Sequence, residues 1–260
     1  MPQINTEREK EWKITEMRNY KVVKHNDIIQ QSRFNLSTQE QKIILYLISK
    51  IKPGDMNFEE HEFEIIDFCR VCGFDETSGG NYAYIKKTLK ELRDKSIWVT
   101  LENGDETTLS WFRKVTFRKK GGRVAIRLDD DMKPYLLHLQ SNFTQYELFY
   151  TLGMRSQYSI RLYELLKSYE YRGRAIFSID QLKKLMFAEN YNLFADFRRF
   201  AVDIAVNEIN SLADLHVEYQ LIKSGRKYVK IEFNITYKKD MAERFRARAK
   251  TNQRLLKTKS

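Results

Sequence analysis

The sequence predicts an α+β fold in which a helix-turn-helix followed by a β-hairpin occurs twice in tandem. Residues 177–236 carry the clearer copy, because two stretches with helical spacing of apolar residues precede two stretches that alternate apolar and polar residues around a turn at residues 223–227. Similar stretches recur roughly 110 to 120 positions earlier, which is the size of one small domain. The net charge of +11 indicates a polyanionic partner. Tandem duplicated winged-helix domains account for all three observations.

The 260 residues are enough for two domains of ordinary size. We predict a charged N-terminal arm at residues 1–24, winged helices at 25–140 and 141–237, and a basic tail at 238–260. The arm mixes charges of both signs and lacks the apolar run of a secretion signal, so it is expected to be partly helical or disordered. No apolar run approaches the roughly 20 residues that a membrane span needs. A cytoplasmic protein that binds nucleic acid and no membrane is predicted.

Three helices are predicted at the start of the first domain, at residues 37–51, 63–71 and 81–95. A Ser/Thr cap opens the first helix and a Pro-Gly pair closes it. Ile85, Leu89 and Leu92 share one side of the third helix, which we expect to be buried. The opposite side is basic and is predicted to contact DNA phosphates through Lys86, Lys87, Lys90 and Arg93. A solvated lysine face is the alternative.

The period of the pattern then changes to two, which predicts three strands at residues 96–102, 108–119 and 122–129. The second turn carries many cations and is predicted to be a positively charged wing that includes Lys119, Lys120 and Arg123, together with Lys114 and Arg118. Three aspartates at residues 129–131 follow. They could hold a magnesium ion, but they directly precede a predicted helix, and N-terminal capping is the favoured interpretation.

Cys69 and Cys72 are the two cysteines, spaced C-x-x-C at the end of a short helical pattern. A zinc site would need a second pair of ligands, and the four histidines lie scattered without ligand spacing. A redox site would need a thioredoxin-like setting. We therefore expect buried thiols, and neither a metal nor a cofactor is predicted.

The second domain is predicted to begin with a linking helix at residues 143–154 and a core helix at 156–173. A strand and a short helix lead to a second helix of the helix-turn-helix at residues 192–210. Such a helix enters the DNA major groove. The basic turn of the following hairpin is predicted to contact phosphates through Lys223, Arg226 and Lys227.

A helical wheel divides the helix at 192–210 into two sides when about 100° is allowed per residue. The predicted buried side comprises Phe197, Phe200, Ala201, Ile204, Ala205, Glu208 and Leu212. The opposite side holds Arg199 with several short amides and carboxylates, the side chains that read guanine, adenine and cytosine edges. Its members are Asn192, Asp196, Arg199, Asp203 and Asn210, of which the first four are the predicted base-reading residues. Arg198 falls at the edge and is assigned to a phosphate. The surface of an ordinary amphipathic helix is the alternative.

The tail at residues 238–260 holds nine basic residues against two acidic ones, a net charge of +7. We expect a frayed or disordered arm that adds affinity for DNA of any sequence. A solubilising tail is the alternative.

These stretches together resemble the replication initiator (Rep) proteins of iteron-containing bacterial plasmids. The resemblance runs from about Val22 to Thr236, and its specificity lies in the order of many modest pieces. They are FNLSTQEQKIILYLISKI, DFCRVCG, GGNYAYIKKTLKELRDKSIWV, MKPYLLHL, FTQYEL, SQYSIRLYELLKSY, DFRRF with NEIN, and GRKYVKIEF.

The resemblance implies a DNA-binding initiator. Members of that family bind direct repeats of double-stranded DNA (iterons) at an origin; the C-terminal domain reads bases, and the N-terminal domain contacts the backbone and dimerises. Monomers initiate, whereas dimers of some members repress their own gene through an inverted repeat. The family also implies opening of an AT-rich region and recruitment of the host initiator and the replicative helicase.

Two enzyme classes lack their motifs in this sequence. No two histidines lie at i and i+2, as a rolling-circle nickase would require, and no Gly-Lys pair exists for an ATP-binding phosphate loop. We therefore expect a protein that is not an enzyme. A winged-helix transcriptional repressor without an initiation role is the alternative function, and a protein-interaction module would leave the basic surfaces unexplained.

Overall fold

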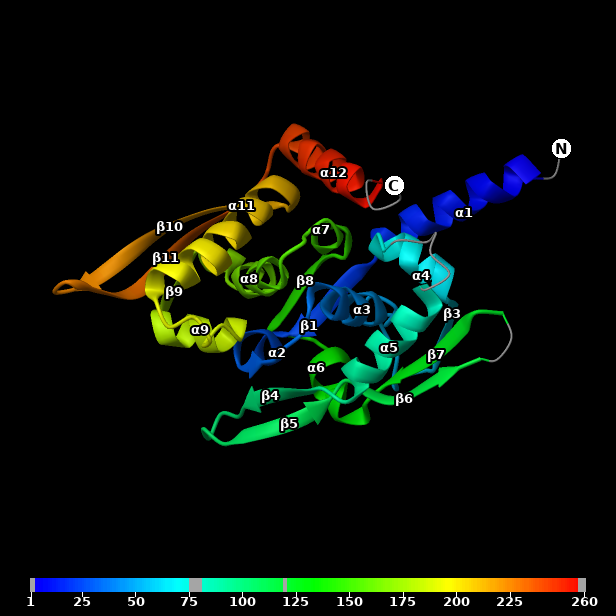
Figure 1. Ribbon diagram of the computed structural model, residues 1–260, viewed down its shortest axis with the longest axis horizontal. Coiled ribbons are helices and arrows are strands. Elements are labelled where there is room, and N and C mark those ends of the chain that lie inside the picture. Colours follow the sequence, from blue (N-terminus) through cyan, green and yellow to red (C-terminus); the bar gives the residue numbers. More distant parts are fainter. Residues whose placement is uncertain (1–2, 75–80, 119–120, 257–260) are drawn as a thin grey trace.

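The computed structural model describes residues 3–74, 81–118 and 121–256, except for the side chains of residues 3–7 and 81. Helix α1 (Gln3–Arg18) leads into β1 (Lys21–His25), which pairs antiparallel with β8 (Phe143–Glu147) more than a hundred residues later. Figure 1 shows this pair running through the middle of the molecule, between the two halves of the chain. The prediction of a linking helix at 143–154 is therefore wrong for residues 143–147, which form β8. Only α7 (Phe149–Leu152) is helical there.

The first half contains the predicted three helices, α3 (Thr38–Ile48), α4 (Ile65–Cys72) and α5 (Asn81–Arg93). Ser37 and Glu40 form a capping box at the start of α3. The short segments α2 (Asn26–Gln30) and β2 (Ser32–Arg33) precede α3, and β3 (His61–Glu64) precedes α4. Cys69 and Cys72 are buried, as predicted, and burial raises the pKa of the Cys72 thiol.

Strands β2 to β7 form two small sheets. The strand predicted at 108–119 is broken at buried Trp111 into β5 (Glu106–Ser110) and β6 (Phe112–Phe117). Strand β5 pairs with β4 (Ser96–Thr100), which also pairs with β2, whereas β6 pairs with β7 (Arg123–Leu128), which also pairs with β3. The chain thus leaves one sheet and enters the next at Trp111.

The three aspartates cap and brace a helical turn, as predicted. The Asp129 side chain accepts a hydrogen bond from the Asp131 amide at the start of η1 (Asp130–Met132), and α6 (Lys133–Leu136) continues the turn. Asp130 lies 2.9 Å from an Arg127 guanidinium nitrogen and 3.0 Å from the Lys133 ammonium. The carboxylates therefore serve local structure.

The second half has the order expected of a winged helix. It comprises α8 (Gln157–Lys167), η2 (Glu170–Arg172), β9 (Arg174–Ser178), α9 (Ile179–Met186), α10 (Phe194–Phe197), the π-helical turn η3 (Arg198–Val202), α11 (Asp203–Leu212), β10 (Leu215–Ser224) and β11 (Lys227–Tyr237). The three strands form an antiparallel sheet in the order β10-β11-β9. Figure 1 shows the β10–β11 hairpin projecting beyond the helices.

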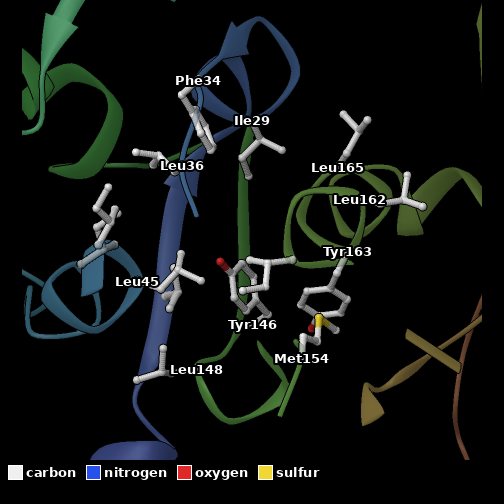
Figure 2. Close-up of a cluster of buried hydrophobic side chains, with 14 of the residues drawn as sticks. Ile29, Phe34, Leu36, Leu45, Tyr146, Leu148, Met154, Leu162, Tyr163 and Leu165 are labelled. Carbon is white, nitrogen blue, oxygen red and sulfur yellow. The ribbon is translucent and has the colours of Figure 1, made fainter. Parts of the chain in front are cut away.

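Helix α8 lies between the two halves and belongs to the core of both. It contacts α3 on one side and α11 on the other. Figure 2 shows its Tyr163 among apolar side chains gathered around β1 and β8, and the Tyr163 and Tyr146 ring centroids are 5.3 Å apart. Buried Arg161 of α8 donates hydrogen bonds to the Ser32 carbonyl in β2 and to the Leu185 carbonyl in α9. These bonds fix the two halves against each other.

The C-terminal segment is a packed helix, α12 (Met241–Leu256), so the expectation of a frayed or disordered arm is wrong for the described part. Ala247, Thr251 and Leu255 recur every four residues, are buried, and form the stripe that α12 packs against the protein. Thr251 lies so close to Gly153 that a Cβ at that glycine would come within 2.9 Å of the threonine hydroxyl. Because most of the neighbouring residues in the sequence are charged, this apolar stripe was not recognised as the buried side of a helix.

In the part of the chain that the structure describes, no helix is long and apolar enough to cross a membrane.

Candidate nucleic-acid interface

The candidate recognition helix is continuous from α10 through the π-helical turn η3 into α11. Phe197, Ala201, Ala205, Glu208 and Leu212 are buried, as predicted. Phe200 and Ile204 are 44% and 40% exposed, so their predicted burial is wrong. A π turn closes its hydrogen bonds over five residues instead of four, which shifts the angular position of the side chains around it.

The predicted base-reading residues differ in their surroundings. Asn192 is exposed in the loop before α10, Asp196 is half-buried in α10, and Arg199 is exposed in the π turn with its guanidinium 5.2 Å from the Phe200 ring centroid. Asn210, which the wheel placed on the same side, instead exchanges two hydrogen bonds with the Val217 backbone in β10, at 2.7 and 2.8 Å. It joins the helix to the sheet.

Asp203 is held within the protein. The Tyr219 hydroxyl donates a hydrogen bond to one carboxylate oxygen, and the Arg198 guanidinium lies 3.5 Å from the other. Burial, with the hydrogen bond to Asp203, raises the pKa of Tyr219 to about 12, so this hydroxyl remains a donor at neutral pH. The geometry gives Asp203 a part in fixing the helix against β10 and in orienting Arg198, which the wheel did not predict.

The basic tip of the second wing lies beside the start of the recognition helix. Lys223, Arg226 and Lys227 are exposed around a turn in which Gly225 has a φ of +59°. The Phe194 ring of α10 and the Tyr228 ring of β11 have centroids 5.4 Å apart, and the Lys223 ammonium lies 4.9 Å from the Tyr228 ring. The tip of the second wing and the first turn of the recognition helix are thus in contact.

Helix α5 presents the basic side that was predicted from its spacing. Ile85, Leu89 and Leu92 are buried. The charged side chains of the opposite side are exposed, namely Lys86, Lys87, Lys90 and Arg93. Within this set, Lys87 lies 3.8 Å from Glu91, an exposed pair of small energetic value. The remaining cations are suited to phosphate contacts.

Removing two of these cations is expected to change the salt dependence of DNA binding. In the variant Lys86→Ala with Lys90→Ala, the slope of log K against log salt should fall by about 1.8, because each neutralised phosphate contributes roughly 0.9. Titrations across a salt series measure it. Lys10→Ala with Lys13→Ala, on exposed positions of α1, removes the same charge elsewhere. Equal slopes for both double variants would contradict the assignment of α5.

The first wing differs from the expected positive patch. Arg118 lies 2.9 Å from Glu62 and 3.3 Å from Glu60, and Arg123 lies 3.5 Å from Glu62 and 3.6 Å from Glu64. Lys114 also pairs with Glu60, at 3.6 Å. Acidic residues on and before β3 therefore compensate these cations. Lys119 and Lys120 lie outside the described residues.

Comparisons with known proteins agree with this architecture. A family model described as "Initiator Replication protein, WH1" matches residues 21–167, and one described as "Initiator Rep protein, WH2" matches residues 178–235. This division places α7 and α8 with the first module, whereas we predicted a boundary after residue 140. Helix α8 packs against both α3 and α11, so its apolar pattern is consistent with either module. The sequence pattern alone assigned it to the second.

Two relatives extend over most of the chain. A replication initiation protein of Escherichia coli is 22% identical over 222 residues, which are 81% of this chain and 68% of the relative. The crystal structure of the Pi initiator protein in complex with iteron DNA is 20% identical, with a TM-score of 0.68 over 86% of this chain and 99% of that one, and has the same fold. With both winged-helix modules matched in order, this chain belongs to the family of initiator replication proteins.

Proposed function

We propose that this chain starts replication by binding directly repeated double-stranded DNA sites at an origin, without covalent chemistry of its own. The observation that carries the proposal is a recognition helix that presents the exposed Arg199 and whose first turn packs against the basic second wing through the contact of Phe194 with Tyr228. The bound iteron DNA of the structurally similar Pi protein supports the choice of ligand.

In this proposal the two modules divide the work. The recognition helix reads base edges, and the wing and α5 neutralise phosphates. The orientation of the modules is set before DNA arrives, because Arg161 bonds to both halves and α8 packs in both cores. Linking two contact surfaces rigidly lowers the entropic cost of the second contact.

Strand opening and partner recruitment form the later part of the proposal. Several copies bound to adjacent repeats would share the cost of bending the duplex, which is of the order of 1–6 kcal/mol for a site of this kind. Recruitment of the host initiator and replicative helicase, and repression of its own gene by a dimer, are proposed from family membership.

Arg199→Ala tests the base-reading assignment. The variant is expected to lose about 1–3 kcal/mol of binding free energy on the cognate duplex and to relax the preference at one base position, because a bidentate arginine–guanine contact has this value. Competition binding against single-base variants of the site measures both effects. Arg226→Ala, in the wing, should weaken all sequences alike. Equal weakening by Arg199→Ala on all sequences would contradict the assignment.

A repressor without an initiation role remains the second candidate, since a winged helix also suits an operator. Footprinting on the DNA that flanks the gene separates the two functions. Protection of direct repeats beside an AT-rich tract would support initiation, whereas protection of a single inverted repeat would favour repression.

A further inference from the structure

We infer that Phe200 and Ile204 read the C5-methyl groups of thymines in the major groove, an inference that rests on the proposed binding of duplex DNA. Both side chains are exposed on the recognition helix, at 44% and 40%, because of the π-helical turn. In the major groove, the methyl group is the feature that distinguishes thymine by apolar contact. The thymine methyl group is therefore the part of the major groove that the apolar side chains of Phe200 and Ile204 can contact.

Phe200 is held in place before any ligand arrives. Its ring lies nearly parallel to that of Tyr191, with an interplanar angle of 19° and centroids 6.5 Å apart. Tyr191 in turn lies 6.1 Å from the Tyr158 ring of α8, and its carbonyl accepts a 2.6 Å hydrogen bond from Lys183 of α9. This support reduces the entropy that Phe200 would lose on binding, which favours a specific contact.

The position of Phe200 also predicts which thymine it reads. The Arg199 guanidinium lies over the Phe200 ring, at 5.2 Å from its centroid, so the two side chains reach the groove next to each other. Arginine on this surface is the predicted reader of guanine. A thymine next to that guanine is therefore the expected partner of Phe200. Ile204 lies one helical turn further on and would contact a thymine at a neighbouring step.

A protein partner is less consistent with this surface. Stable protein interfaces bury about 800 Å² on each side, around a core depleted of charge. Here Arg199 lies over the Phe200 ring, and Arg198 and Asn207 are exposed on the same helix. Scattered apolar residues on a helix with exposed cations and an amide match DNA base edges better.

The experiment uses the full chain and a duplex that it selects from a random-sequence library. Each thymine of the selected duplex is replaced, one at a time, by deoxyuridine, which removes the methyl group and keeps the base pairing. For the parent protein, we expect a loss of roughly four-fold in affinity at the thymine next to the guanine, the value of one buried methyl group. Phe200→Ala should bind the selected duplex more weakly and should be insensitive to that replacement.

Three controls keep the result interpretable. Phe200→Leu preserves an apolar contact and should retain sensitivity to the replacement. Ile204→Ala should lose sensitivity at a different thymine. Ile176→Ala removes an equally exposed apolar side chain, 42% exposed on β9, and should leave the whole pattern unchanged. Thermal unfolding of each variant establishes that it is folded.

The possible failures are distinct. A duplex may be selected and yet lose the same affinity on deoxyuridine replacement with Phe200→Ala as with the parent. That result would overturn the inference and leave the proposed function standing. The same holds if Phe200→Ala binds normally but changes the association state, which would indicate a protein contact. If no duplex is enriched, the proposed function fails and takes the inference with it.

Discussion

Glu208→Ala is expected to lower the free energy of unfolding by about 1–3 kcal/mol, because it leaves two backbone amides without their acceptor and the half-buried Arg254 without its partner. Glu208 lies on the buried side of α11 and is 9% exposed. Its carboxylate accepts hydrogen bonds from the Arg155 and Ser156 amides, at 3.0 and 3.2 Å, and pairs with the Arg254 guanidinium of α12. One side chain thus joins the recognition helix, the start of α8 and the C-terminal helix.

Urea unfolding of the full chain measures this loss. Glu208→Gln separates the contributions, since the amide oxygen can still accept from the backbone while the charge that Arg254 faces is removed; an intermediate loss is expected. Glu218→Ala is the matched control, because this glutamate is exposed on β10, and its variant should lie within about 0.5 kcal/mol of the parent. A Glu208→Ala variant as stable as Glu218→Ala would show that α12 is held by its apolar stripe alone.

The parts of the interface that follow a regular period were predictable from the sequence. Ile85 and Leu89 mark the buried side of α5 because an undistorted helix repeats every 3.6 residues. The same rule fails at Phe200, because the π turn changes the angle per residue within the recognition helix, and nothing local in the sequence announces it. The side chains we assign to thymine methyl groups were for this reason placed in the core.

Other differences come from contacts between residues far apart in the chain. The strand β8 lacks a partner near it in sequence, and its pairing of Glu147 with Lys21 is visible only in three dimensions. The cations of the first wing looked unpaired because Glu62 lies about sixty residues before Arg123. Charge counted along the sequence therefore overstated the positive potential of this wing, whereas α5 keeps its predicted exposed cations.

Lys42→Met is expected to stabilise the protein at neutral pH, because the parent buries a cation on α3. Lys42 lies on α3 and is 7% exposed. Burial lowers its pKa from the usual 10.5 to about 8, although the charge of Glu208 opposes this change. A shift of this size corresponds to a cost of about 3 kcal/mol for keeping the ammonium charged at pH 7. Methionine fills a similar volume without that charge.

The pH dependence distinguishes this explanation from better packing. Between about pH 8 and about pH 10.5 the unfolded parent binds the Lys42 proton and the folded parent does not, so this residue makes the parent more stable as pH rises through that window. The advantage of Lys42→Met should therefore be largest at pH 7 and disappear as pH reaches about 10.5. Subtracting the parent curve cancels the titration of other groups, and Lys90→Met on the exposed side of α5 should show no such trend. An advantage that persists unchanged at high pH would mean that keeping Lys42 charged costs nothing, and that methionine stabilises the protein by packing alone.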